Sequence, residues 1–163
     1  MLDQIIQRLQ NISPFDIYSV TADGQVAPWY TVDGSIMQDL VIRDIDLAVQ
    51  VQSISAQIAF WGRMVAQTKR VWEIEERNYR AWRSRFTVKQ LSPAEGDKAP
   101  SMAKVEALYR ASPEYAKFQN ATERAEEAHE SSKSIFDAFK AKRDMLRASI
   151  YRSRDDGSVS MSV

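Results

Sequence analysis

The sequence predicts an all-α protein in which a short irregular N-terminal arm precedes a long antiparallel helical hairpin. Three observations predict this class. Residues 44–88 contain no proline and a single glycine. Apolar residues recur there every seven positions, which is typical of a helix that packs along one face. A segment rich in proline and glycine at 91–100 interrupts the pattern, and helical composition resumes after it. We therefore expect an arm at 1–43, the hairpin at 44–154 and a frayed tail at 155–163.

The arm combines a short amphipathic start with an irregular segment. Apolar residues within 2–9 have the spacing of one helical face, which predicts a short helix. Turn-forming residues then surround the β-prone stretch 29–32, which favours an irregular segment with room for a small hairpin. These turn-forming residues are Asn11, Pro14, Asp23, Gly24, Pro28, Asp33 and Gly34.

The first long helix is predicted from two heptad series. One series is apolar at every member, and its companion is apolar at four of six. A seam sustained over this length favours a single helix of about 60 Å with a coiled-coil-like face. The first series is Val51, Ile58, Val65, Trp72, Tyr79 and Phe86, and the companion is Leu47, Ile54, Trp61, Thr68, Glu75 and Trp82.

The second long helix is predicted to begin after a short helical stretch at 101–111. Ser112 is a suitable N-cap, Pro113 fits the first helical position, and Glu114 supplies an early acid. We expect this helix to reach about Arg152. With a short loop between antiparallel helices, Trp61 should face small residues and the smaller Val51 and Ile54 should face phenylalanines. The expected partners are Ala125, Ala128 and Ser132 for Trp61, and Phe136 and Phe139 for the other two.

The charges cancel overall but are segregated along the chain. The 22 Lys and Arg residues balance the 22 Asp and Glu residues. Residues 1–56 hold seven Asp against two Arg, whereas 57–91 hold eight basic residues against three Glu. Residues 92–132 hold five basic and eight acidic residues, and 133–163 hold seven and four. The two positive blocks indicate an acidic partner, either a polyanion or a neighbouring subunit.

The composition argues against an enzyme. With no Cys and one His, the chain cannot build thiol chemistry, a disulfide framework or a Cys/His zinc site. No glycine motif for nucleotides and no Ser/His/Asp set occurs, so we expect no cofactor. We interpret His129 as a packing residue. The acidic cluster is spread around its helix among basic residues, so we expect no metal site there. Its members are Glu123, Glu126, Glu127 and Glu130.

Two basic stripes are the most informative feature. At 100° per residue, Arg63, Arg70 and Arg77 lie within about 40° of one another, on the side opposite the first heptad series. Arg80 and Arg85 flank them. The stripe on the second helix repeats every seven residues, at Lys133, Lys140, Arg147 and Arg154. Such stripes are solvated faces, or they pair with the Asp-rich arms of neighbouring subunits, or they form a track for nucleic-acid phosphates.

Aromatic residues interleave the first stripe, as they do in single-strand binders. We assign Trp61 and Trp72 to the core because they belong to the heptad seam. Trp82 lies nearer the edge of the seam, and we expect it to be the first ring to reach a base, followed by Tyr79 and Phe86.

The order of parts resembles the bacteriophage UvsY-type recombination mediators and their shorter relatives. The resemblance covers about residues 45–152. It rests on AFWGRMVAQTKR at 59–70, KVEA at 104–107, SPEY at 112–115 and KRDML at 142–146. The family implies helical subunits in ring-like homo-oligomers that bind single-stranded DNA. It also implies a RecA-like recombinase and a single-strand-binding protein as partners, and the cytoplasm of the host bacterium as the location. The Asp-rich arm is not part of the family pattern.

The resemblance implies that basic residues late in the first long helix contact DNA, which corresponds by position to Lys69, Arg70, Arg77, Arg80 and Arg83. Self-association is expected on physical grounds as well, because a two-helix hairpin leaves Phe60 and Tyr109 off its seam. No segment of the sequence suits a membrane. The predicted DNA contacts are Arg63, Lys69, Arg70, Arg77, Arg80, Arg83, Arg85, Trp82, Lys140 and Arg147.

An alternative of a different class remains open. The chain is then a phage structural or regulatory scaffold whose hairpin docks on other proteins, with its basic stripes facing acidic surfaces.

Overall fold

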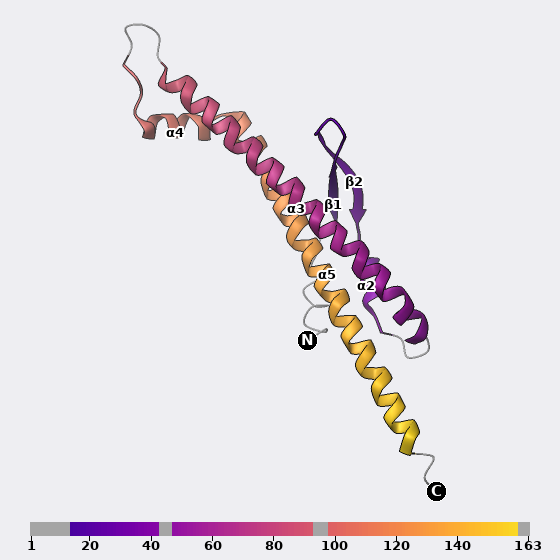
Figure 1. The fold of residues 1–163 in the computed structure, drawn as a ribbon. Coiled ribbons are helices and arrows are strands. Elements are labelled where there is room, and N and C mark those ends of the chain that lie inside the picture. Colours follow the sequence, from indigo (N-terminus) through magenta and orange to yellow (C-terminus); the bar gives the residue numbers. More distant parts are fainter. Residues whose placement is uncertain (1–13, 43–46, 93–97, 160–163) are drawn as a thin grey trace.

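The computed structural model describes residues 14–42, 47–92 and 98–159. The protein is mostly helical (76%), which confirms the helical class, and it also has a small two-stranded sheet that an all-α assignment omits. Figure 1 shows two long helices side by side, with the sheet beside one of them and a short helix at one end. The elements in order are β1 (Phe15–Val20), β2 (Val26–Val32), α2 (Ile36–Leu40), α3 (Leu47–Leu91), α4 (Met102–Arg110) and α5 (Pro113–Val159).

Helix α3 buries the companion heptad series more deeply than the first one. Ile54, Trp61 and Thr68 of the companion series are buried, together with Met64 and Val71. Every member of the first series is only half-buried. The line of contact with α5 therefore runs closer to the companion series, and the first series forms its edge.

Helices α3 and α5 pair in an antiparallel direction, but not in the register that the sequence suggested. The Trp61 ring stacks on Phe139, with 6.5 Å between ring centroids, and Trp72 stacks on His129 at 5.8 Å. The predicted partners of Trp61, around Ala128, are therefore wrong. The expectation assumed a short loop, whereas the connection from 92 to 112 contains α4. Because the connection is longer, the register of α5 against α3 differs from the expected one.

The start of α5 is as predicted. The Ser112 hydroxyl accepts a hydrogen bond from the Tyr115 amide at 3.2 Å, and Pro113 occupies the first helical position. The helix continues to Val159, beyond the predicted end near Arg152, so residues 155–159 are helical and not part of a frayed tail. No proline interrupts the added stretch, so the backbone ladder can extend past the last apolar position.

The described part of the arm, residues 14–42, contributes to the core. Strands β1 and β2 form an antiparallel hairpin whose turn uses Gly24 at φ +80°. Ile17, Val32 and Leu40 are buried against the two long helices, in one cluster with Trp61 and Phe139. The small hairpin for which the sequence left room is therefore present, whereas the helix α2 was not expected. The short helix predicted within 2–9 lies outside the described residues.

A buried lysine fastens the arm to α5. The Lys142 side chain is 3% exposed, and its ammonium group donates to the Asp39 carbonyl at 2.5 Å and the Val41 carbonyl at 3.2 Å. These carbonyls belong to the end of α2 and the residue after it, where the helix leaves backbone oxygens without intrahelical partners. The hydrogen bonds supply those partners and offset the cost of burying the charge.

Phe60 and Tyr109, which two helices alone would leave exposed, are covered by other parts of the same chain. Tyr30 of β2 packs edge-on against Phe60, with 6.2 Å between centroids. Tyr109 of α4 is buried beside Trp82 and Tyr115. These two positions therefore do not require a second subunit to cover them.

Candidate nucleic-acid interface

One face of α3 carries four arginines in a row. Arg63, Arg70, Arg77 and Arg85, here called the α3 arginine row, are all exposed. At 100° per residue they fall within an arc of about 80°, and successive members seven residues apart are separated by about 10.5 Å. The row extends for about 33 Å along the helix, facing away from buried Trp61 and Thr68.

None of the four arginines in the row forms an ion pair with a described carboxylate. The acids of this stretch instead pair with cations on the flank of the row. Lys69 lies 3.9 Å from Glu73, and Arg80 pairs with Glu76. Both pairs join exposed side chains one helical turn apart, so each contributes about 0.2–1 kcal/mol and yields readily to another anion. The row itself presents about four uncompensated positive charges.

Arg83 has a different environment from the row. Its guanidinium lies over the Tyr109 ring, 5.0 Å from the centroid, so it helps to hold α4 against α3. Arg83 is still exposed to solvent.

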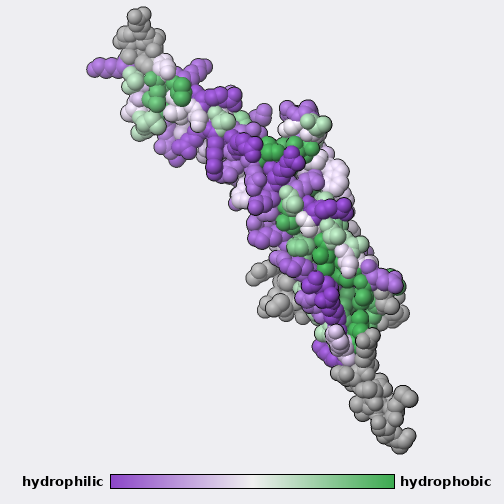
Figure 2. All heavy atoms as spheres, viewed as in Figure 1, coloured by the Kyte–Doolittle hydropathy of each residue, from purple (hydrophilic) through white to green (hydrophobic). Residues whose placement is uncertain are grey.

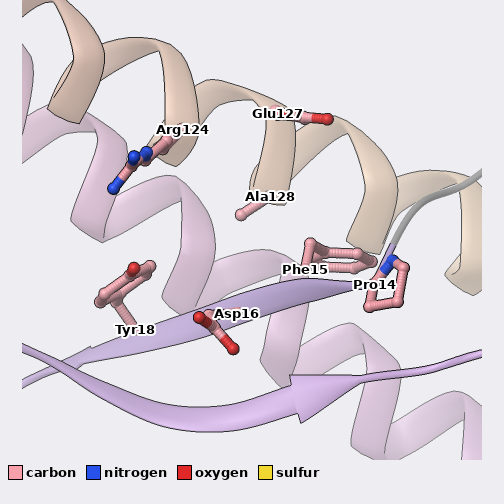
Figure 3. A pocket seen from close by; sticks show the side chains of 7 residues that line it. All are labelled: Pro14, Phe15, Asp16, Tyr18, Arg124, Glu127 and Ala128. Carbon is pink, nitrogen blue, oxygen red and sulfur yellow. The ribbon is translucent and has the colours of Figure 1, made fainter.

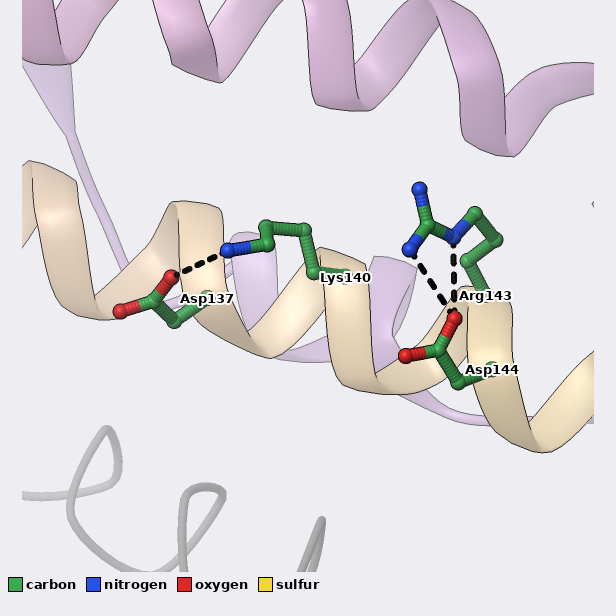
Figure 4. A network of polar contacts seen from close by, with 4 residues as sticks. All are labelled: Asp137, Lys140, Arg143 and Asp144. Atoms are coloured by element: carbon green, nitrogen blue, oxygen red, sulfur yellow. Dashed lines mark hydrogen bonds and ion pairs between the residues drawn. The ribbon is translucent and has the colours of Figure 1, made fainter.

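Two of the three described members of the stripe on α5 pair with acids. Lys140 pairs with Asp137 at 3.2 Å and lies 5.2 Å from the centre of the Phe136 ring, and Lys133 lies 3.8 Å from Glu130. Figure 4 shows the Lys140 pair and the neighbouring pair of Arg143 with Asp144. Arg147 is exposed and has no carboxylate partner within the described ranges, and the Arg154 side chain lies outside what the structure describes. The α3 arginine row is therefore the stronger candidate surface.

Trp82, the ring predicted to stack on a base, lies in an aromatic cluster at the end of the α3–α5 pair where α4 packs. Its centroid lies 5.4 Å from Phe118, 5.6 Å from Phe86 and 6.2 Å from Tyr79, and it meets Tyr109 edge-on at 6.3 Å. The ring is half-buried. These contacts join α3, α4 and α5 and give Trp82 a structural role.

Two other rings of this region also pack inside the molecule. Burial in the aromatic cluster, reinforced by Tyr115 and Tyr109, raises the pKa of Tyr79 above its ordinary value near 10. His129 is buried and stacked on Trp72, and its Nδ1 atom lies 3.4 Å from the Thr68 hydroxyl oxygen. His129 thus packs between the helices, as expected.

The surface pockets of the described residues do not resemble a catalytic or metal site. The one in Figure 3, about 200 Å³, lies between β1 and α5 and brings Asp16 and Tyr18 near Arg124. Within 14–42, 47–92 and 98–159, no three His, Asp or Glu side chains are grouped to hold a metal ion. None of the helices in those ranges contains an apolar stretch long enough to cross a lipid bilayer.

The structure adds two residues that sequence reasoning missed. Trp29 and Tyr30 of β2 are 52% and 46% exposed, with 6.3 Å between their ring centroids. The sequence marks them as β-prone, but only the packing of Tyr30 on Phe60 brings them to the helix that carries the arginine row.

Comparison with protein-family models, with curated proteins and with solved structures finds no match for this chain.

Proposed function

We propose that this protein binds single-stranded DNA along the α3 arginine row and acts without catalysing a reaction. The observation that carries the proposal is the absence of carboxylate partners around Arg63, Arg70, Arg77 and Arg85 among the described residues. Four unpaired arginines on one face of a straight helix are an arrangement suited to a flexible polyanion. A solvated face that only balances local charge needs no such segregation.

Binding energy comes mainly from counterion release. Each phosphate that meets an arginine frees condensed counterions, so affinity falls steeply as salt rises. The spacing of about 10.5 Å between members is close to the Debye length at 0.1 M salt. Each arginine therefore acts as a nearly independent contact. Lys69 and Arg80 on the flank can add contacts, because exposed ion pairs hold them weakly. Arg83 can add another, because it is exposed to solvent.

We further propose that the protein works as a recombination mediator. This part rests on the resemblance to the UvsY-type family, with a RecA-like recombinase and a single-strand-binding protein as partners in the host cytoplasm. A mediator must release DNA to the recombinase, and a salt-sensitive site with few contacts per subunit suits this role.

Assembly into a homo-oligomer, as a ring, belongs to the same proposal. Several weak sites linked in one assembly bind a strand far more tightly than one site alone. Figure 2 shows a small group of apolar side chains at the α4 end of the molecule and a longer one along the other half. Val88 and Met102 at this end are 65% and 61% exposed, and they are candidates for subunit contacts.

The same exposed apolar end supports a second candidate function, a phage scaffold that docks on another protein. In that case the arginine row binds an acidic surface of the partner protein, and the affinity for DNA is weak at every salt concentration. The binding test below separates the two functions.

The test is fluorescence anisotropy with a labelled oligo-dT at low salt. We expect binding by the wild-type chain and a loss of at least tenfold in the Arg63→Ala, Arg70→Ala, Arg77→Ala variant. The control is the Lys133→Ala, Lys140→Ala variant, which removes two exposed cations of α5 that lie outside the α3 arginine row and pair with Glu130 and Asp137. We expect it to lose much less, about threefold.

Circular dichroism and light scattering check that both variants keep the helicity and size of the wild type. Equal losses in the row variant and in the control would reject the row as the binding surface. Undetectable wild-type binding at low salt would reject the DNA function and favour the scaffold.

A further inference from the structure

We infer that Trp29 and Tyr30 form the base-stacking platform of the DNA site, at the end of the α3 arginine row that begins with Arg63. The inference rests on the proposed function and deepens it, because it assigns the contact that the bases make. It also gives a role to the arm, which is unexplained by the arginine row alone.

The two rings are available to a ligand. Trp29 is 52% exposed and Tyr30 is 46% exposed. By contrast, the rings of Trp61, Trp72 and Trp82 on α3 pack against rings of α5. Trp82 in particular is surrounded by four rings. A nucleobase can reach Trp29 without displacing any part of the core.

A β-bulge directs Trp29 outward. Tyr30 pairs with Ile17 and Pro28 pairs with Tyr18, so Trp29 is the extra residue that has no partner on β1. Bulges often re-aim a side chain in this way. Pro28 lacks an amide hydrogen, which makes this edge a poor place for another strand to add by hydrogen bonding. The exposed rings are therefore better suited to stacking than to sheet extension.

The rings border the arginine row. The Tyr30 ring packs edge-on against Phe60, with 6.2 Å between centroids. The Gln67 side-chain amide donates to the Tyr18 carbonyl at 3.1 Å. Phe60 and Gln67 are the neighbours of Arg63 one turn before and one turn after it on α3. Because both contact the hairpin, the hairpin lies beside the turns of α3 on either side of Arg63.

The hairpin carries the exposed acids Asp16, Asp23 and Asp33, each of which accepts a hydrogen bond from a neighbouring residue, so the positive charge of this corner comes from α3. Arg63 and Arg70 have no acidic partner within the described ranges, so they attract phosphates to the place where the rings are exposed. Phosphates on the arginines and one or two bases on the rings reproduce the combination used by sequence-tolerant single-strand binders. A double helix keeps its bases stacked on each other and cannot use the rings in this way.

The experiment compares two labelled probes of equal length, oligo-dT and an abasic oligodeoxynucleotide with the same number of phosphates. We expect the wild type to bind oligo-dT about ten- to hundredfold more tightly than the abasic probe, as one stacked base provides. The Trp29→Ala, Tyr30→Ala variant should bind both probes with the wild-type affinity for the abasic one. The Trp29→Phe, Tyr30→Phe variant keeps the rings and should retain most of the preference.

Failure of this inference and failure of the function are distinguishable. Equal wild-type affinity for the two probes, with binding that still depends on the arginine row, overturns the platform and leaves the function intact. No binding of either probe overturns both. If the alanine variant fails to fold, photocrosslinking of 5-iodouracil-substituted oligo-dT to the wild type decides the matter. Crosslinks at Trp29 or Tyr30 support the platform, and crosslinks confined to Trp82 or Phe86 overturn it.

Discussion

The two halves of the α3–α5 pair bury different side chains. Where the arm lies, Trp61, Ile135 and Phe139 are at most 2% exposed, because β1, β2 and α2 add a third layer. Towards α4, the rings of Tyr79, Trp82 and others remain half-buried. A third layer removes side chains from water more completely than two helices can. We therefore expect the arm-covered half to set global stability and the α4 half to open locally at lower cost.

The largest expected effect is the loss of Trp61. Trp61→Ala removes a ring that is 2% exposed and stacked on Phe139, and should lower the free energy of unfolding by about 3–5 kcal/mol. Trp82→Ala, in the other half, should cost about 1–3 kcal/mol because that ring already meets solvent. Urea denaturation monitored by circular dichroism measures both. A cost for Trp82→Ala equal to that for Trp61→Ala would remove the distinction between the halves.

Lys142 tests whether the arm belongs to the core. Lys142→Met keeps the length of the side chain but leaves the Asp39 and Val41 carbonyls without their donor. We expect a loss of about 1.5–3 kcal/mol, as for hydrogen bonds to a charged group. Hydrogen exchange should show faster exchange in the described part of the arm. Lys140→Met, an exposed neighbour, is the control and should be nearly neutral.

The smallest expected effect is a gain in stability. Gly62 lies inside α3, and a Cβ added there would meet the Phe136 ring at 3.4 Å without a clash. Gly62→Ala should therefore stabilise the protein by about 0.5–1 kcal/mol through helix propensity. A thermal melt should show a midpoint raised by a few degrees. A lowered midpoint would mean that the helices must approach more closely at this point than the distance suggests.

The sequence could predict the elements whose signals are local. The Pro-free heptad run over 44–88 and the Ser112-Pro113 start both correspond to observed helices because periodicity and capping depend on neighbouring residues. The register between the helices could not be predicted, because it depends on how the connection folds. That connection contains α4, whose Tyr109 packs against Trp82.

The candidate site was predictable in the same partial way. Exposed arginines at seven-residue spacing follow from helical geometry, so the row on α3 could be placed from sequence. The lack of acidic partners around these arginines could not be predicted from the sequence. Glu73 and Glu76 are close to the row in sequence, but they pair with Lys69 and Arg80. The exposed rings at 29–30 were hidden for another reason. Their relation to Arg63 depends on a contact between β2 and α3, elements far apart along the chain.

The salt dependence of oligo-dT binding shows whether the arginines of the row hold the phosphates. For single strands the slope of log K against log salt is about −0.7 for each phosphate neutralised, so the four arginines of the row predict a slope of about −3. The Arg63→Ala, Arg70→Ala, Arg77→Ala variant should show a slope smaller in magnitude by about 2. A wild-type slope near zero, or a variant slope equal to that of the wild type, would contradict the claim that these arginines hold the phosphates.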